Sequence, residues 1–252
     1  MYPKEVSEMN IGIIGAGNIG ATLARKLAAC GHHIKLANSK DPHSIQDLAD
    51  AIGAHAVSKE QAVVGVDVII LSIPFAKYPD LKQTLSQVPA SVVVIDTSNY
   101  YPQRDGAIKD VDDGKPESVW VSEQIGRPVI KAWNAALAAT LAEKGQPDGA
   151  AVRIALPVAG DDPGALTLVQ SLVADTGFTA LVAGTLHDSW RQQPGTPAYC
   201  TELTLPTLRL ALDAADKARS PLNRDALMTR FMTPGSEFTH EQIVATNREM
   251  TA

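Results

Sequence analysis

Three glycines at a fixed spacing are the first residues that could support chemistry. The run Gly15-Ala16-Gly17-Asn18-Ile19-Gly20 follows an apolar stretch and opens a helix-forming one. Gly15 permits a sharp turn, Gly17 leaves room for a pyrophosphate beside the backbone, and Gly20 lets the helix pack closely on the strand. Phosphates would bind the free amides at the start of that helix. The spacing predicts a dinucleotide-phosphate site formed by Gly15, Gly17, Asn18, Ile19 and Gly20.

The residues after the next strand-like run indicate which dinucleotide binds. That run, residues 33–37, is followed by Asn38-Ser39-Lys40. A site for NAD places a carboxylate here, whereas a 2′-phosphate requires cations and hydroxyls. Lys40 and Ser39 can both donate to a phosphate, and Ser44 adds a hydroxyl at the next helix start. We therefore predict NADP(H) as cofactor; the alternative is a solvated lysine in a polar turn.

Polar residues also follow the later strands. An apolar run ends in Ser72-Ile73-Pro74, the run 92–96 is followed by Thr97-Ser98-Asn99, and the run 128–134 ends in Asn134. Open α/β sheets bind their ligands outside the carboxyl ends of the strands. The cofactor site is therefore expected to include Ser72, Ile73, Pro74, Ser98 and Asn134 as well as Asn38.

A hydride acceptor that is a carbonyl or an imine would need a protein acid. The candidates are Lys131, His187 and Tyr199. A lysine at a strand edge and a histidine in a loop are, however, more often exposed residues with no catalytic role. Trp190, Arg191 and Tyr199 are the candidates for acceptor binding. The stretch 190–199 is expected to cover the nicotinamide, from the same subunit or from a dimer partner.

These residues require a parallel sheet to position them. Alternating strand and helix patterns over most of the chain predict an α/β fold, a Rossmann doubly wound parallel sheet with a small C-terminal helical region. Residues 1–185 would form the NADP-binding domain, and 186–252 the loop and helices for the acceptor pocket or dimerisation. Further expectations are a helix over 78–88, a surface loop over 100–116 and helical spacing over 199–218.

Composition narrows the class of protein. The 252 residues are 45% hydrophobic and carry a net charge of −6, which argues against nucleic acid or an anionic membrane as partner. Two cysteines suit a reducing, cytoplasmic setting, and residues 1–10 lack a signal-peptide apolar segment. No His and Cys spacing indicates a metal site. A small-molecule redox acceptor and a homodimer are the expected partners.

Taken together, these motifs resemble the coenzyme F420-dependent NADP oxidoreductases, whose relatives include the reductase domains of STEAP-type ferrireductases. The resemblance rests on the glycine turn, Asn38-Ser39-Lys40, Ser72-Ile73-Pro74, the segment 131–134 and Ala159-Gly160-Asp161-Asp162, in the same order. It implies that the glycine turn holds the pyrophosphate, that Ser39 and Lys40 hold the 2′-phosphate, and that residues 72–74 lie beside the nicotinamide. In that family the later loops and C-terminal helices contribute to the acceptor pocket.

The function expected from the sequence is an NADP(H)-dependent oxidoreductase whose partner is a deazaflavin, a flavin or a quinone-like ring. Hydride transfer to such a ring needs little beyond close positioning in a dry pocket. A ketone or imine reductase on the same framework, and a non-catalytic NADP-binding redox sensor, are the alternatives.

Overall fold

The computed structural model describes residues 8–233, 235 and 237–252, so most of the expected polar N-terminal stretch lies outside the described residues. Within these ranges, eight strands form one sheet in the order β3-β2-β1-β4-β5-β6-β7-β8. The strands are β1 Asn10–Ile14, β2 His33–Ala37, β3 His55–Ala56, β4 Val68–Leu71, β5 Val93–Asp96, β6 Ile130–Lys131, β7 Ala155–Ala159 and β8 Thr179–Gly184. All neighbours pair in parallel except β6 and β7, which pair antiparallel. The predicted Rossmann-like α/β fold is confirmed, with one reversal at this pair.

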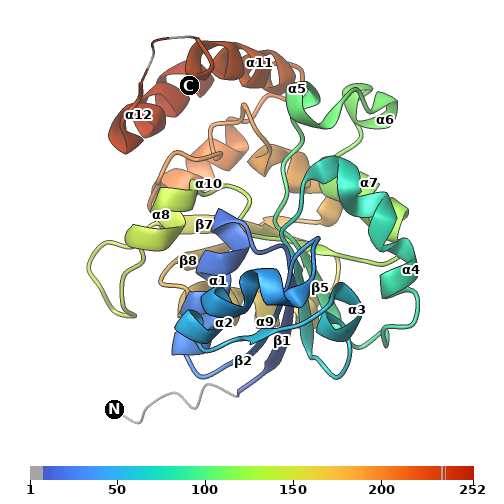
Figure 1. Cartoon of the computed structure of the whole chain (residues 1–252). Helices are drawn as coiled ribbons and strands as arrows, with labels where there is room; N and C mark the ends of the chain where they lie inside the picture. The colour runs from blue at the N-terminus through green and yellow to red at the C-terminus, as the bar shows by residue number, and fades with distance from the viewer. Residues whose placement is uncertain (1–7, 234, 236) are drawn as a thin grey trace.

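Helices connect and cover the strands (Figure 1). The α-helices are α1 Asn18–Ala29, α2 Gln46–Ile52, α3 Lys59–Ala62, α4 Lys82–Leu85, α5 Pro102–Asp105, α6 Lys109–Asp112, α7 Glu117–Ile125, α8 Ala138–Glu143, α9 Pro163–Asp175, α10 Leu205–Asp213, α11 Ser220–Phe231 and α12 His240–Thr251. Three 3₁₀ helices are η1 Pro42–Ile45, η2 Phe75–Leu81 and η3 Leu186–Gln192.

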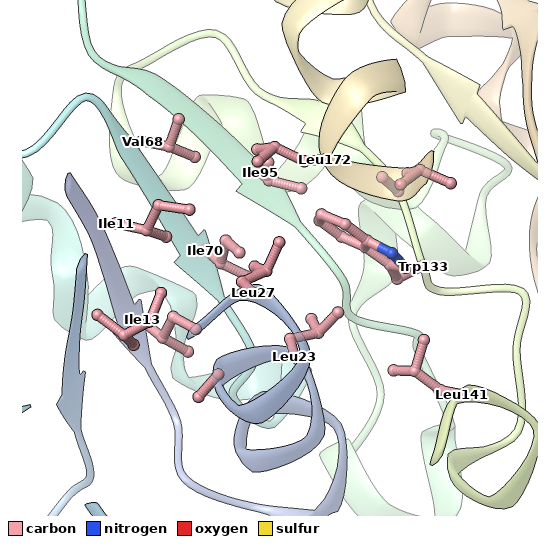
Figure 2. Packing of buried hydrophobic residues seen from close by; sticks show 14 of the residues in the cluster. Ile11, Ile13, Leu23, Leu27, Val68, Ile70, Ile95, Trp133, Leu141 and Leu172 are labelled. Carbon is pink, nitrogen blue, oxygen red and sulfur yellow. The ribbon is translucent and has the colours of Figure 1, made fainter. Parts of the chain in front are cut away.

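Strand β4 shows why the sheet is central. All four of its residues are buried, because Val68 and Ile70 face one hydrophobic cluster while Ile69 and Leu71 face the other. A strand covered on both faces needs a continuous apolar run rather than an alternating one. Figure 2 shows the first cluster, where residues of β1, β4 and β5 meet those of α1 and α9. The two larger hydrophobic clusters therefore cover β4 and its neighbouring strands, one on each face of the sheet.

Three local expectations were wrong in detail. The helix expected over 78–88 begins earlier as the 3₁₀ helix η2, because Pro79 lies inside it and has no amide hydrogen to donate. The loop expected over 100–116 contains α5 and α6 and starts at the fully buried Tyr100. The helical spacing over 199–218 becomes helix only at α10, which has Pro206 in its first turn.

The C-terminal region is attached to the sheet by both apolar and polar contacts. Helix α10 packs Leu208 and Leu212 against β7 and β8. Helices α11 and α12 lie together at the top of Figure 1. Asn247 Nδ2 on α12 donates to Cys200 O at 3.2 Å, and His240 Nε2 lies 2.6 Å from Glu202 Oε1. Hydrogen bonds and packing thus connect α12 to the segment 200–202 and α10 to the sheet.

Candidate functional site

The glycine turn joins β1 to α1, and each of its three glycines has a different environment. Gly15 has a φ of +115°, a conformation that side chains other than glycine rarely adopt. A Cβ on Gly20 would lie 1.8 Å from the carbonyl oxygen of Gly15, so only glycine permits this close packing. A Cβ on Gly17 would meet no atom of the described residues within 4 Å. The space beside Gly17 is open where a pyrophosphate would approach the helix start.

The residues after β2 form a short ordered loop. Asn38 Nδ2 donates to Ser44 Oγ at 2.8 Å, and Asn38 Oδ1 accepts from the amide of Lys40 at 2.9 Å. Ser44 Oγ in turn donates to the carbonyl of Asp41, whose carboxylate caps η1. Asn38 and Ser44 therefore shape the loop, while the exposed Ser39 and Lys40 remain available to a ligand.

This loop borders a cavity of about 530 Å³ that also reaches the end of β4. Ile73 and Pro74 line it opposite Ser39 and Lys40. The cavity lining also includes residues that sequence reasoning missed: Ser58, Lys59 and Lys77. The ammonium group of Lys59 lies 3.9 Å from Glu60 Oε1, and that of Lys77 lies 3.9 Å from Asp80 Oδ2. Both ion pairs are exposed, so a more highly charged anion can displace the carboxylates. Three lysines against the two carboxylates of Glu60 and Asp80 leave the cavity lining with a net positive charge, which favours a ligand that carries phosphate.

Three side-chain amides interlock beyond the ends of β5 and β6. Asn134 Nδ2 donates to Asn99 Oδ1 at 3.0 Å and to Gln192 O at 2.8 Å. Gln192 Nε2 donates back to Asn134 Oδ1 at 2.8 Å. Trp133, immediately before Asn134, is held at a φ of +58°, and its indole donates to buried Thr176. The side-chain amide of Asn134 is thus fully engaged, and it fixes the C-terminal end of η3 to the sheet edge.

A buried charged cluster lies directly under that edge. Lys131 is fully buried, and its Nζ lies 3.4 Å from Asp96 Oδ2 and 3.5 Å from Glu117 Oε2. It also donates to Ser98 O at 3.0 Å. The interpretation of Lys131 as an exposed strand-edge lysine is therefore wrong. Because its ammonium is paired inside the protein, it supports the edge instead of reaching a substrate.

Burial, the charge of Lys131 and hydrogen bonds together determine how the carboxyls of Asp96 and Glu117 titrate. Burial alone would raise the pKa of Asp96, but Lys131 and the hydroxyls of Ser118, Ser98 and Tyr78 more than offset it, so this pKa is lowered. Burial raises the pKa of Glu117 to about 7, against the opposing attraction of Lys131. The Ser98 hydroxyl donates to Asp96 Oδ1 at 2.6 Å and so points into the protein.

The remaining acid candidates lie in different surroundings. His187 is exposed on η3. Tyr199 is half-buried, and its hydroxyl lies 2.7 Å from that of Tyr101. Burial raises the pKa of both tyrosines well above the ordinary value, so both hydroxyls stay protonated and can donate. Tyr101 is a residue that sequence reasoning missed, since nothing in a polar loop sequence indicates its partner 98 positions away.

Trp190 and Arg191 lie apart from the cavity beside Ser39. The Arg191 guanidinium is 5.8 Å from the Trp190 ring centre and 3.8 Å from Asp188 Oδ1. Lys217 Nζ is 6.0 Å from the same ring. Trp190 contributes to a smaller cavity with Glu117 and Lys217. A contact of Arg191 with the acceptor would therefore compete with its existing carboxylate partner, Asp188.

The described residues contain neither a membrane-spanning helix nor a metal-binding cluster of side chains. No helix there is long and apolar enough to cross a membrane. No group of three or more His, Cys, Asp or Glu side chains there could hold a metal ion.

Comparison with known proteins identifies relatives. The family described as "NADP oxidoreductase coenzyme F420-dependent" matches residues 10–100, which run from β1 past the end of β5. Protein YjhV of Escherichia coli (strain K12) is 38% identical over 104 residues, covering 41% of this chain and 76% of YjhV. A hypothetical protein from Sinorhizobium meliloti has 32% identity and a TM-score of 0.65, and the match covers 79% of this chain and 96% of that one.

A more distant structure shares the fold. A proposed F420-dependent NADP reductase from Arthrobacter has 18% identity and a TM-score of 0.57, covering 71% of this chain and 86% of that one. The segment that matches the family, residues 10–100, begins at the strand that leads into the glycine turn. It includes Ser39, Lys40 and Ser72-Ile73-Pro74. The expected family resemblance is confirmed: this chain belongs to the coenzyme F420-dependent NADP oxidoreductase family and is an NADP-dependent oxidoreductase.

Proposed function

We propose that this protein transfers a hydride between NADP(H) and a ring-type redox acceptor such as a deazaflavin, a flavin or a quinone. The observation that carries the proposal is the continuous cavity from Ser39 and Lys40 to Ile73 and Pro74. A dinucleotide whose pyrophosphate lies at Gly17 would direct its 2′-phosphate toward Lys40 and its nicotinamide toward the carboxyl ends of β4 and β5.

Lys40, Lys59 and Lys77 support the phosphate end of this arrangement. Each contributes a point charge, and hydrogen bonds between ionised partners are stronger than those between neutral ones. The Ser39 hydroxyl is exposed beside Lys40 and can add a donor. A carboxylate at either position would instead repel the phosphate.

A ring-type acceptor fits the residues at the carboxyl ends of the strands, because it does not require a general acid from the protein. Hydride transfer to such a ring needs positioning and a dry pocket, and the protein need not supply an obligatory acid. Lys131 is buried in ion pairs and His187 is exposed, which makes both poor acids for a substrate at this edge. The interlocked amides of Asn99, Asn134 and Gln192 form a rigid platform there instead.

A second candidate, reduction of a ketone or imine, is favoured by one observation. The hydroxyls of Tyr101 and Tyr199 form a pair that remains protonated and could donate to a carbonyl oxygen or an imine nitrogen. Such an acceptor requires a donor in the transition state.

Stopped-flow oxidation of NADPH distinguishes these functions. The nicotinamide absorbance would be followed after mixing with a 5-deazaflavin, FMN, a quinone, a ketone or a preformed imine, and each reaction repeated with NADH. We expect fast oxidation of NADPH by at least one ring acceptor and slower reaction with NADH. Turnover confined to the ketone or imine would support the second candidate and contradict the first. In that case Tyr199→Phe would abolish the chemical step while NADPH still binds.

A further inference from the structure

A second cavity lies between the sheet edge and the C-terminal helices. Its volume is about 220 Å³, and we call it the tyrosine cavity. Its apolar walls include Leu137, Leu227, Met228 and Phe231, and its polar lining comes from Tyr101, Tyr199, Arg224 and Asn247. The side-chain amide of Asn247 is already engaged with Cys200 O at 3.2 Å.

The tyrosine cavity adjoins the platform where the nicotinamide is expected. Tyr101 follows Asn99 by two residues, and Leu137 follows Asn134 by three. The backbone amide of Cys200, next to Tyr199, donates to Ala135 O at 3.0 Å. The chain segments that leave the interlocked amides therefore pass straight into the walls of this cavity.

The cavity offers hydrogen bonds but no unpaired charge among its described lining residues. Arg224 is the permanently charged residue there, and its Nε donates to Asp225 Oδ1 at 2.8 Å while its guanidinium lies 5.4 Å from the Tyr100 ring. Burial raises the pKa of the neighbouring Cys200 thiol to about 12, so that group is neutral as well. One proton suffices to join the two tyrosine hydroxyls, which leaves a second O–H that can turn toward a ligand oxygen.

The volume of the tyrosine cavity limits the size of the ligand that it can hold. Pockets for drug-sized ligands measure roughly 300–1,000 Å³. The tyrosine cavity, at about 220 Å³, is smaller than this range. A fused three-ring system with a charged side chain would have to leave much of itself outside.

We propose that the tyrosine cavity is the acceptor subsite and that it takes a compact, uncharged single-ring carbonyl compound of the quinone class. This inference rests on the proposed hydride transfer and narrows its acceptor. Leu227, Met228 and Phe231 hold the ring, and the Tyr101–Tyr199 pair donates to its oxygen. Helices α11 and α12 thus select the acceptor by size and neutrality.

The reaction in this subsite transfers two electrons. NADPH bound at the predicted site would supply one hydride with its electron pair: a C–H bond of the dihydronicotinamide would break, a bond from that hydrogen to the quinone would form, and NADP⁺ would remain. One tyrosine O–H gives its proton to the oxygen of the reduced acceptor, and water returns a proton to the tyrosinate. The net change consumes one NADPH, one acceptor and one proton.

The test fills the cavity from α11. Met228→Trp places a larger side chain in it, and Leu222→Trp, on the same helix at a residue that is 70% exposed, is the matched control. With duroquinone as the compact neutral probe, we expect Met228→Trp to raise KM about tenfold or more by overfilling the site, with NADPH affinity unchanged. Leu222→Trp should behave as the parent protein, and thermal melting checks that all variants fold.

Tyr199→Phe provides an independent second variant that preserves the cavity's shape. It should lower kcat for duroquinone and leave NADPH affinity unchanged. The inference is overturned if a folded Met228→Trp protein reduces duroquinone like the parent, or if the parent reduces FMN but not duroquinone. The latter result would leave the proposed function intact. Failure of the parent to oxidise NADPH with any ring acceptor would instead refute the proposed function itself.

Discussion

Replacing Lys131 by methionine should destabilise the fold strongly, and increasingly so as the pH rises. The side chain is fully buried, with Asp96 Oδ2 at 3.4 Å and Glu117 Oε2 at 3.5 Å. Coulomb's law with an effective dielectric constant of about 20 gives roughly 5 kcal/mol for a pair at 3.4 Å. Part of this attraction only offsets desolvation, and loss of one partner from a buried pair costs about 3–5 kcal/mol. We expect a loss of that size.

The pH dependence gives the sharper test. The folded protein holds the Glu117 proton up to a pKa of about 7, against 4.5 ordinarily, so this group favours folding at low pH. Between these values the unfolded chain releases the proton first, and stability falls by roughly 3 kcal/mol as pH rises. Above about pH 7 the contribution of Glu117 is flat in the parent. Without Lys131 its pKa rises further, so the variant continues to lose stability above pH 7.

Urea unfolding of the parent and Lys131→Met at pH 5, 6, 7, 8 and 9 measures both effects. Glu117→Gln is the control, because it removes the titrating carboxyl and should abolish the parent's loss between pH 5 and 7. The double variant Lys131→Met/Glu117→Gln should recover part of the stability and lose the extra slope. The reasoning is refuted if Lys131→Met is within about 1 kcal/mol of the parent at pH 8, well below the cost expected for an orphaned buried charge.

Two further predictions concern the glycine turn and the attachment of α12. Gly17→Val should stay folded, because a Cβ there meets open space, but it should bind NADPH more weakly in calorimetry. Gly20→Val should fail to fold or should melt at a much lower temperature, since its Cβ would lie 1.8 Å from Gly15 O. Equal melting temperatures for the two variants would contradict this. Glu202→Ala removes the 2.6 Å contact to His240, so amide exchange should quicken in α12 and stay unchanged in β1. Unchanged exchange in α12 would show that the contact does not anchor it.

The elements predicted well are those whose signals are local. The run 33–37 became β2 with the predicted bounds. The turn at Gly15 was predictable because its backbone requirement is met within a few residues. Local sequence thus predicted the sheet and the backbone turn at Gly15.

The features that were missed depend on residues distant in the chain. Lys131 is buried because Asp96 and Glu117 approach it from other elements, although its place within an apolar strand was a clue. Lys59 and Lys77 join Lys40 only when β3 and β4 align beside β1 and β2. Tyr101 and Tyr199 meet for the same reason. Charge and hydroxyl partners that are set by tertiary packing leave no periodic signal in the sequence.

The central claim, an NADP(H) site with the 2′-phosphate at Ser39 and Lys40, is tested most directly by nucleotide affinity. Calorimetry would compare NADPH and NADH on the parent and on the double variant Ser39→Asp/Lys40→Ala. Each charge-assisted hydrogen bond contributes roughly 1.5–3 kcal/mol, so we expect NADPH to bind the variant at least tenfold more weakly while NADH binds as well or better. Equal losses for the two nucleotides, or a parent protein that binds them equally, would contradict the assignment.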